Sequence, residues 1–480
     1  MTSARKRLGA WYTPDDLVST VVDHVVTPEF VRARSGPGRT GRGRSLRVLD
    51  PACGDGRFLA AVEERVNAAG VACELVGVDI DPAAAGAARD RCPGAHIVHA
   101  DALAHDFAGQ RFDVVIGNPP FLSQMASATT RGGASARSGG PYADAAVEFL
   151  ALAGELVDPC GGRVAFVLPQ SILAARDAQR VRTSFDARAH MFWSWWTGER
   201  AFDAQVHTCA LAFEFGSPQT PVAGRMPGNW TGVVTSRHDV PSLPMLATSG
   251  CLADRATLNA NFRDEYYGMV PAVGDHATGP PLITSGLIDP GRSRWGERPV
   301  TFAKRRLQSP RIDLAALDPQ MQAWAAKRLV PKVLVANQTA IIEALCDERG
   351  EFLPAVPVVG VYPGRGESLF DVGPIEPDLV WRIAAVLTSP VASAWAWHRQ
   401  AGTGLSVGTI RLGPVLLGEL PWPAGELDAA VIALRAGDVR GCGTAMLDAY
   451  AVESPADRHT LLTWWLTAVE RIDRRASAMT

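Results

Sequence analysis

Short hydrophobic runs rich in β-branched residues alternate with amphipathic segments along the first half of the chain. The runs predict buried strands at residues 46–50, 75–79, 97–101, 112–116, 162–169 and 209–215. Apolar residues at helical spacing predict helices at residues 17–26 and 57–69, with another beginning at Pro82. At the first of these helices, Thr13 is the expected N-cap and Pro14 the first helical residue. Strands that alternate with helices predict an α/β fold with a doubly wound, Rossmann-like parallel sheet.

The alternating pattern stops near residue 215 and is followed by a stretch rich in proline and glycine. We therefore expect a first domain at residues 1–215 and a mixed α/β domain of short strands and loops at residues 216–425. Residues 426–480 are expected to be helical, with an apolar stripe formed by Leu461, Leu462, Trp465 and Val469.

Composition narrows the class of protein. The 480 residues suffice for two or three domains, and 47% hydrophobic and 20% charged residues indicate a folded globular chain. The formal net charge of -3 requires any nucleic-acid surface to be local. The 8 cysteines form no C-x-x-C pair, which favours a reducing compartment and argues against a structural zinc. With no signal-like or membrane-spanning stretch recognised, we expect a cytoplasmic protein without membrane or metal partners.

Three aspartates and one asparagine follow successive predicted strands. Because parallel strands end at one edge of a sheet, Asp50, Asp79, Asp101 and Asn118 are expected to meet there. The glycine loop at residues 51–56 is not G-x-G-x-x-G and precedes no Walker lysine, which disfavours dinucleotides and triphosphates. Carboxylates at these positions suit ribose hydroxyls, an ammonium and a base amino group, as in an adenosyl cofactor with an amino-acid tail. The alternative for any single aspartate is an ordinary loop cap.

The tetrapeptide at residues 118–121, Asn-Pro-Pro-Phe, ends the fourth predicted strand on a stiff backbone. Asn118 offers a side-chain carbonyl, Pro119 a backbone carbonyl, and Phe121 a flat apolar face. Together these groups suit a planar ring with an exocyclic amino group. An ordinary Asn-Pro-Pro turn is the alternative.

These motifs, in this order and behind Tyr-Thr-Pro at residues 12–14, resemble the amino-methylating DNA methyltransferases over about residues 9–215. The order is similar to the gamma class of adenine-N6 enzymes of type II or IIG restriction-modification systems. The resemblance implies S-adenosylmethionine bound by Thr13, Asp50, Ala52, Cys53, Gly54, Gly56, Asp79, Ile80, Asp101, Ala102 and Asn118. It also implies a flipped adenine held by Asn118, Pro119, Pro120 and Phe121, with Phe202 stacked on its other side. Four nearby aromatics compete for that last role, or belong to the core: Phe192, Trp193, Trp195 and Trp196.

The expected chemistry follows from the amine, whose lone pair is delocalised into the adenine ring. Acceptors at Asn118 and Pro119 would localise that lone pair toward the sulfonium methyl, without a strong general base. The base must leave the duplex to be reached. Residues 125–140, polar and without core periodicity, are expected to be either a loop that orders on DNA or a solvated insertion.

A second feature is basic and lies in the 216–425 region. Residues 292–311 interleave basic residues with Trp295 and Phe302, which suits phosphate contact and base stacking, although a solvated face is the alternative. The DNA-binding candidates are Arg292, Arg294, Lys304, Arg305 and Arg306. Residues 332–337 and 395–423 resemble segments of target-recognition domains.

We therefore expect a site-specific enzyme that methylates adenine N6 in double-stranded DNA, in a restriction-modification or phage-defence context. We expect a monomer, with a companion restriction endonuclease or defence proteins as candidate partners. Three alternatives remain open: cytosine-N4 as the target, an RNA or protein-glutamine methyltransferase, and a noncatalytic DNA-binding specificity subunit.

Overall fold

The computed structural model describes residues 13–36, 44–121, 144–198, 207–216, 228–260, 263–275, 278–364 and 378–479. The chain divides into two units, Met1–Val234 and Thr235–Thr480. The residues just before this division stay with the first unit because Trp230 lies against Phe213 and donates its indole N–H to Asp186 at 2.7 Å. The predicted helical segment 426–480 lies within the second unit.

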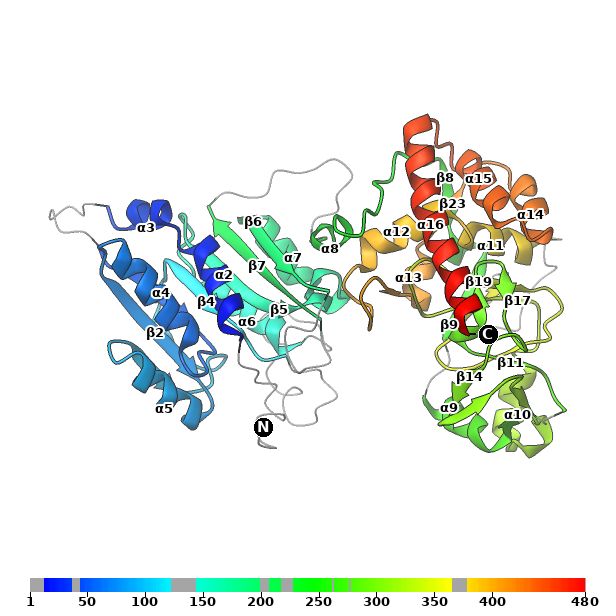
Figure 1. The fold of residues 1–480 in the computed structure, drawn as a ribbon, viewed down its shortest axis with the longest axis horizontal. Helices are drawn as coiled ribbons and strands as arrows, with labels where there is room; N and C mark the ends of the chain where they lie inside the picture. Colours follow the sequence, from blue (N-terminus) through cyan, green and yellow to red (C-terminus); the bar gives the residue numbers. More distant parts are fainter. Residues whose placement is uncertain are drawn as a thin grey trace. The chain divides into compact units, whose positions relative to one another are not determined.

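The first unit is built on a seven-stranded sheet in the order β3-β2-β1-β4-β5-β7-β6 (Figure 1). Strands β1 to β5 are parallel, as predicted, whereas β7 runs antiparallel to both β5 and β6. The strands are β1 (Leu46–Asp50), β2 (Cys73–Asp79), β3 (His96–His99), β4 (Val114–Gly117), β5 (Arg163–Pro169), β6 (Ala189–Trp196) and β7 (Thr208–Phe215).

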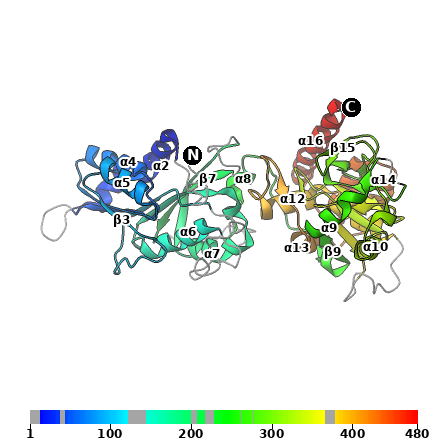
Figure 2. The same cartoon turned by 90° about the horizontal axis from the view of Figure 1, so that it is seen from below.

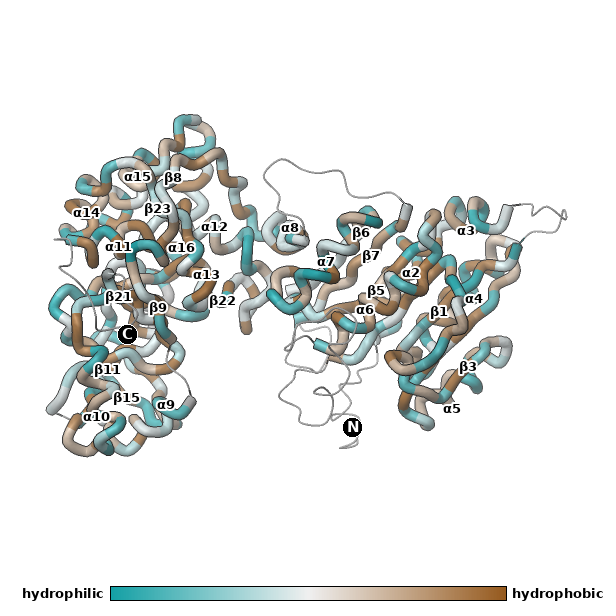
Figure 3. Tube along the Cα trace, turned by 180° about the vertical axis from the view of Figure 1, so that it is seen from behind, coloured by the Kyte–Doolittle hydropathy of each residue, from teal (hydrophilic) through white to brown (hydrophobic). Residues whose placement is uncertain are grey.

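Helices cover both faces of this sheet, as a doubly wound fold requires (Figure 2). One face carries α2 (Asp15–Val25), α4 (Arg57–Ala68) and α5 (Pro82–Arg91), and the other carries α6 (Ala145–Leu156) and α7 (Gln179–Asp186). The shorter helices are α3 (Pro28–Arg34), η2 (Gln170–Leu173), η3 (Arg176–Ala178) and α8 (Gly232–Thr235). The apolar stripe of α2 is buried as its spacing predicts, at Leu17, Val18, Val21, Val22 and Val25. The central strands β5 and β7 are strongly hydrophobic (Figure 3).

One local prediction is wrong, and one strand was not predicted. Thr13 is not the N-cap of α2, because Pro14 takes that position without a side-chain cap and the Thr13 hydroxyl faces another residue. The aromatic stretch before residue 197 was expected to supply core residues or a base-stacking ring, but no strand was predicted there. It forms β6, in which Trp193 stacks on His24 with ring centroids 4.7 Å apart and Phe192 lies under the Arg163 guanidinium.

The second unit has a four-stranded sheet in the order β19-β17-β21-β9 and several two-stranded pairs. Its strands are β8 (Thr248–Cys251), β9 (Ala256–Ala260), β10 (Val273–Gly274), β11 (Leu282–Ile283), β12 (Ile288–Asp289), β13 (Arg292–Ser293), β14 (Val300–Phe302), β15 (Arg305–Leu307), β16 (Arg311–Ile312), β17 (Lys332–Val335), β18 (Gln338–Thr339), β19 (Ala344–Asp347), β20 (Leu353–Pro354), β21 (Val359–Pro363), β22 (Ile410–Arg411) and β23 (Pro421–Pro423). This matches the predicted mixture of short strands and loops.

The helices of the second unit include the predicted C-terminal ones. They are η4 (Leu252–Asp254), α9 (Arg263–Met269), η5 (Val270–Ala272), η6 (Ser285–Leu287), η7 (Leu314–Ala316), α10 (Pro319–Ala326), α11 (Leu379–Leu387), α12 (Pro390–Gln400), α13 (Pro414–Gly418), α14 (Asp428–Arg435), α15 (Val439–Ala449) and α16 (Pro455–Met479). Leu461 and Trp465 of α16 are fully buried. Within the described ranges no helix alone is long and apolar enough to cross a membrane, although the bent pair α11 and α12 reaches that length and composition together.

A buried ion cluster fastens α3 to the end of the sheet where β4 begins. The Asp113 side chain is fully buried and accepts from Arg34 Nε at 2.9 Å and from the Arg47 backbone N–H at 2.9 Å. Arg34 also pairs with Asp158, and Arg44 reaches Asp113 at 3.3 Å. A buried carboxylate is tolerated only when such donors replace its water.

Removing one donor from this cluster should therefore be costly. We expect Arg34→Met to lower the free energy of unfolding of the first unit by about 3 kcal/mol, because part of the charge of Asp113 is left uncompensated. The control is Arg32→Met on the same helix, whose pair with Glu29 is 68% and 77% exposed. It should cost no more than about 0.5 kcal/mol. Equal unfolding midpoints in calorimetry for the two variants would contradict this account.

Candidate active site

The ends of four neighbouring parallel strands bring the predicted polar residues to one edge of the sheet. Asp50 and Asp79 are the last residues of β1 and β2, which pair in parallel register. Asp101 follows β3 closely, and Asn118 comes directly after Gly117, the last residue of β4. The predicted convergence of these side chains at one sheet edge is thus present in the fold.

The glycine loop between β1 and α4 is pinned to the end of β2. Gly54 and Gly56 both adopt positive φ, 52° and 83°, which lets the chain turn tightly into α4. The Gly54 N–H donates to Asp79 Oδ2 at 2.7 Å, and the Cys53 N–H donates to the Val78 carbonyl at 2.9 Å. The loop is therefore a fixed turn that lies over the ends of two strands.

Asp50 is a buried carboxylate with little hydrogen bonding to replace its lost hydration. Its side chain accepts the Ala52 N–H at 3.0 Å and is 1% exposed. Burial raises the pKa of Asp50 to about 8, with a smaller contribution from the negative charge of Asp79. A cationic ligand group beside Asp50 would reverse this penalty, so the residue fits an ammonium.

Asp79 is the second carboxylate of the edge. Its Oδ1 accepts the Asp81 N–H at 2.8 Å, and its Oδ2 accepts the Gly54 N–H. Burial raises the pKa of Asp79, and these two backbone N–H groups partly oppose the rise. Each carboxylate oxygen accepts more than one hydrogen bond, so Asp79 retains capacity for ligand hydroxyls. Ile80 next to it is 54% exposed, an apolar surface unusual for so large a side chain.

The third strand is followed by one exposed residue and one buried residue. Asp101 is exposed and its Oδ1 accepts the Leu103 N–H at 2.9 Å, whereas Ala102 is 3% exposed. This contact is an Asx-type turn, the loop-capping role considered as the alternative. The backbone beyond β3 is thereby fixed next to the Asp79 end of the sheet.

Asn118 is held by an N-terminal residue that precedes α2. Its Nδ2 donates to Thr13 Oγ1 at 3.0 Å. Pro119 is buried, Pro120 is half-buried, and Phe121 packs partly buried against the core cluster that contains α2 and α4. Phe202, predicted as a stacking residue, and residues 125–140 lie outside the described residues.

Arg57, the first residue of α4, was not among the predicted site residues. Its guanidinium contacts the Thr13 carbonyl at 3.2 Å, Asp15 at 2.9 Å and Asp55 at 3.0 Å. The only signal for it in the sequence is its place directly after the glycine loop, because its partners are recognisable only in the folded chain.

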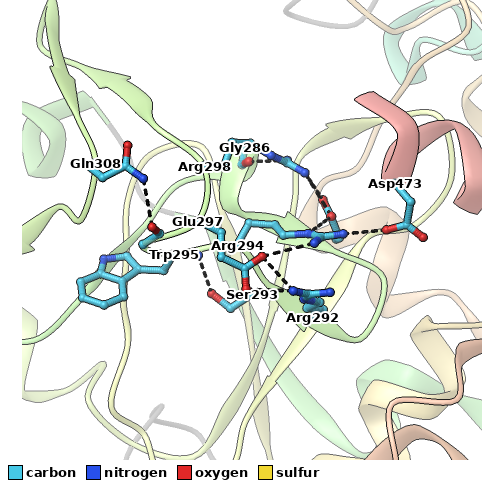
Figure 4. A network of polar contacts seen from close by, with 11 residues as sticks. Gly286, Arg292, Ser293, Arg294, Trp295, Glu297, Arg298, Gln308 and Asp473 are labelled. Carbon is cyan, nitrogen blue, oxygen red and sulfur yellow. Dashed lines mark hydrogen bonds and ion pairs between the residues drawn. The ribbon is translucent and has the colours of Figure 1, made fainter. Parts of the chain in front are cut away.

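The basic stretch of the second unit separates into internal and external cations. Arg294 is 9% exposed and pairs with Asp289, Glu297 and Asp473, while Arg292 pairs with Glu297 at 2.8 Å (Figure 4). We therefore correct the prediction for Arg294, whose charge is neutralised inside the unit and is not presented to DNA.

The remaining candidates of that stretch lie on the β14–β15 hairpin, where Lys304, Arg305 and Arg306 are all exposed. Arg305 additionally donates to the Val273 carbonyl at 2.7 Å. Among the residues that the structure describes, no group of three or more His, Cys, Asp or Glu could hold a metal ion.

The strand order and the helices on both faces define a doubly wound, Rossmann-like domain. Residues 1–185 match the model of the N-6 DNA Methylase family. The chain is thus similar to that family over these residues, which make up less than half of its length.

Two curated relatives match part of the chain. The Type II methyltransferase M.TthHB8I of Thermus thermophilus is 37% identical over 120 residues, which are 25% of this chain and 23% of that protein. The Type II methyltransferase M.CvrRI of Paramecium bursaria Chlorella virus XZ-6E is 28% identical over 116 residues, 24% of this chain and 25% of the relative. The matches thus span about a quarter of the length of these relatives.

Solved structures show similar arrangements at low identity. The type IIG restriction endonuclease BpuSI is 11% identical with a TM-score of 0.41, covering 98% of this chain and 67% of that one. The M protein of the Type I restriction enzyme EcoKI is 20% identical with a TM-score of 0.34, covering 44% of each chain.

The raised pKa of Asp50 makes a pH-dependent prediction for the cofactor-free protein. From about pH 4 to about pH 8 the unfolded chain has lost this proton while folded Asp50 retains it, so the wild type loses stability across that window. Asp50→Asn keeps an acceptor for the Ala52 N–H and does not titrate. The variant should therefore gain thermal stability relative to wild type as the pH rises, reaching a few degrees near pH 8. If the calorimetric melting temperatures of wild type and Asp50→Asn change equally with pH from about pH 4 to about pH 8, the raised pKa of Asp50 is refuted.

Proposed function

We propose that this protein is a site-specific DNA methyltransferase that transfers a methyl group from S-adenosylmethionine to adenine N6 in double-stranded DNA. The observation that carries the proposal is the meeting of Asp50, Asp79 and Asn118 at one sheet edge, within residues matched by the N-6 DNA Methylase family. A restriction-modification context is in keeping with that family. Monomeric assembly and a companion nuclease or defence protein remain predictions.

In this proposal the cofactor lies over the ends of β1 to β3. Asp50 pairs with its ammonium, which is why burial of this carboxylate is tolerated, and Asp79 accepts from its ribose hydroxyls. Ile80, Asp101 and Ala102 border the adenine ring, and the loop containing Cys53, Gly54 and Gly56 lies beneath the amino-acid tail. When bound, S-adenosylmethionine supplies an electrophilic methyl group on a sulfonium. No redox step or metal is invoked, so the protein contributes binding and orientation.

The target base is assigned to residues 118–121. The Asn118 Oδ1 and the Pro119 carbonyl accept hydrogen bonds from the two N–H groups of the amine and draw these N–H bonds out of the ring plane, which localises the nitrogen lone pair. Phe121 provides a stacking surface for a base that has left the duplex. Because these hydrogen bonds strengthen as the nitrogen becomes tetrahedral, they act mainly in the transition state.

The test of this function is Asn118→Ala. We expect the rate of methyl transfer to unmodified DNA to fall about 10²- to 10³-fold, the loss typical of a polar group that acts on the transition state. Binding of S-adenosylmethionine in calorimetry should persist, whereas Asp79→Ala should weaken it. Phe121→Trp is the matched control and should retain measurable activity. Wild-type rates in Asn118→Ala, or methyl groups found only on RNA or protein, would defeat the proposal.

The second unit is proposed to contact DNA phosphates through the exposed cations of the β14–β15 hairpin. Replacing Lys304 and Arg306 together by alanine should reduce the log–log salt slope of binding by about one unit per lost contact. Arg349→Ala is the control, because this exposed arginine of the same unit, 3.8 Å from Glu351, is not among the predicted DNA-binding residues. If salt titrations give the double variant the same slope and affinity as the wild type, the hairpin is a solvated face that makes no phosphate contact.

A further inference from the structure

A chain of polar contacts joins the glycine loop after β1 to the side chain of Asn118. It runs from Asp55 through Arg57 to Thr13 and then to Asn118. Its members come from separate parts of the chain: the loop, the start of α4, the residue before Pro14, and the end of β4. Such a path connects the cofactor edge to the proposed catalytic amide.

The contact between Thr13 and Asn118 fixes the direction of the amide. Thr13 is 5% exposed, and its Oγ1 accepts from Asn118 Nδ2 at 3.0 Å. Because the amide group is planar, holding its nitrogen determines where its oxygen points. Donation by the amide nitrogen also polarises the group, which makes its carbonyl oxygen a better acceptor.

Arg57 in turn holds the main chain at Thr13. Its Nη1 donates to the Thr13 carbonyl at 3.2 Å and contacts Asp15 of α2 at 2.9 Å. Its Nε contacts Asp55 at 3.0 Å, and Asp55 also meets Arg91 of α5 at 3.2 Å. Hydrogen bonding to Asp55 is the largest cause that raises the pKa of Arg57, against the opposing effect of burial.

We propose that Thr13 is a positioning residue that orients Asn118 for methyl transfer, and that Arg57 keeps Thr13 in place. This inference rests on the proposed function and deepens it. It also adds to the role of Thr13, which is predicted to bind the cofactor: its hydroxyl oxygen accepts from the catalytic amide. The amide is thereby aligned before the base arrives, so less orientation remains to be achieved when the base binds.

Conservative substitutions at Thr13 separate positioning from binding. Thr13→Val keeps the side-chain shape and removes the acceptor, whereas Thr13→Ser keeps the hydroxyl. At saturating S-adenosylmethionine, we expect Thr13→Val to methylate unmodified DNA about tenfold more slowly in single turnover, the effect of one net hydrogen bond. Thr13→Ser should stay within about twofold of wild type, since it retains that bond. Calorimetric affinity for S-adenosylmethionine should change less than about twofold in both variants.

The contribution of Arg57 is tested with a double-mutant cycle. Arg57→Met should slow single-turnover transfer, and combining it with Thr13→Val should slow it no further, because both changes remove the same constraint. The matched control is Arg65→Met, another arginine of α4 that pairs with an aspartate of α2, Asp23. It should leave the rate unchanged, which shows that a lost α2–α4 pair alone has no effect.

Each outcome decides one question. Wild-type activity together with an unchanged rate in Thr13→Val overturns the inference and leaves the proposed function intact. The inference also falls if Thr13→Val loses cofactor affinity in proportion to rate, or if the Thr13→Val and Arg57→Met effects add in full. If the wild-type protein binds S-adenosylmethionine but transfers no methyl group to DNA, the proposed function itself fails. Melting midpoints of Thr13→Val and Thr13→Ser, measured alongside, must agree for a rate difference to count as support.

Discussion

The close approach of β1 and β4 is the constraint on which the rest of the site depends. A side-chain carbon at Gly117 would lie 2.4 Å from Asp50 Oδ1, so any larger residue there would displace the Asp50 carboxylate. That contact sets Asp50 beside the residue that precedes Asn118, and the two prolines after Asn118 remove the remaining backbone freedom. The Asp50 carboxylate and the Asn118 amide are therefore brought near each other by packing of the sheet itself, before any ligand contributes.

Each end of the sheet holds a buried carboxylate, but only one of the two carboxylates is paired with arginines. Asp113, at one end, is surrounded by Arg34, Arg44 and the Arg47 N–H, which replace its lost solvation. Asp50, at the other end, accepts the Ala52 N–H and lies near the like charge of Asp79, so its pKa rises. The first arrangement stabilises the fold. The second costs stability and leaves a site that a cation would complete, which is the pattern expected of a binding residue.

The sequence predicted the elements whose signal is local and failed where the signal lies in tertiary contacts. Strands β1, β2, β4 and β5 are apolar runs ended by aspartate, glycine or proline, and the parallel order was predicted from the alternation of strands and helices. Strand β6 was missed because its aromatic residues at 192–196 have no alternation that distinguishes a strand from a core cluster. Thr13 had the local signature of an N-cap. Its actual partner, Asn118, is distant in sequence, so local pattern could not predict the contact.

The basic stretch at residues 292–311 shows why composition alone could not locate a DNA surface. Its arginines look equivalent in the sequence. In the folded chain, however, Arg294 forms ion pairs with Asp289 and with Asp473 of α16, which is far along the chain. An arginine that holds two elements together already has the geometry and charge balance it needs, and turning it toward phosphate would leave the buried Asp289 with Arg298 as its remaining arginine partner. Cations on the β14–β15 hairpin carry no such penalty. The exposed cations of the stretch therefore include those of the turn around Lys304, whereas Arg294 serves the packing of the second unit.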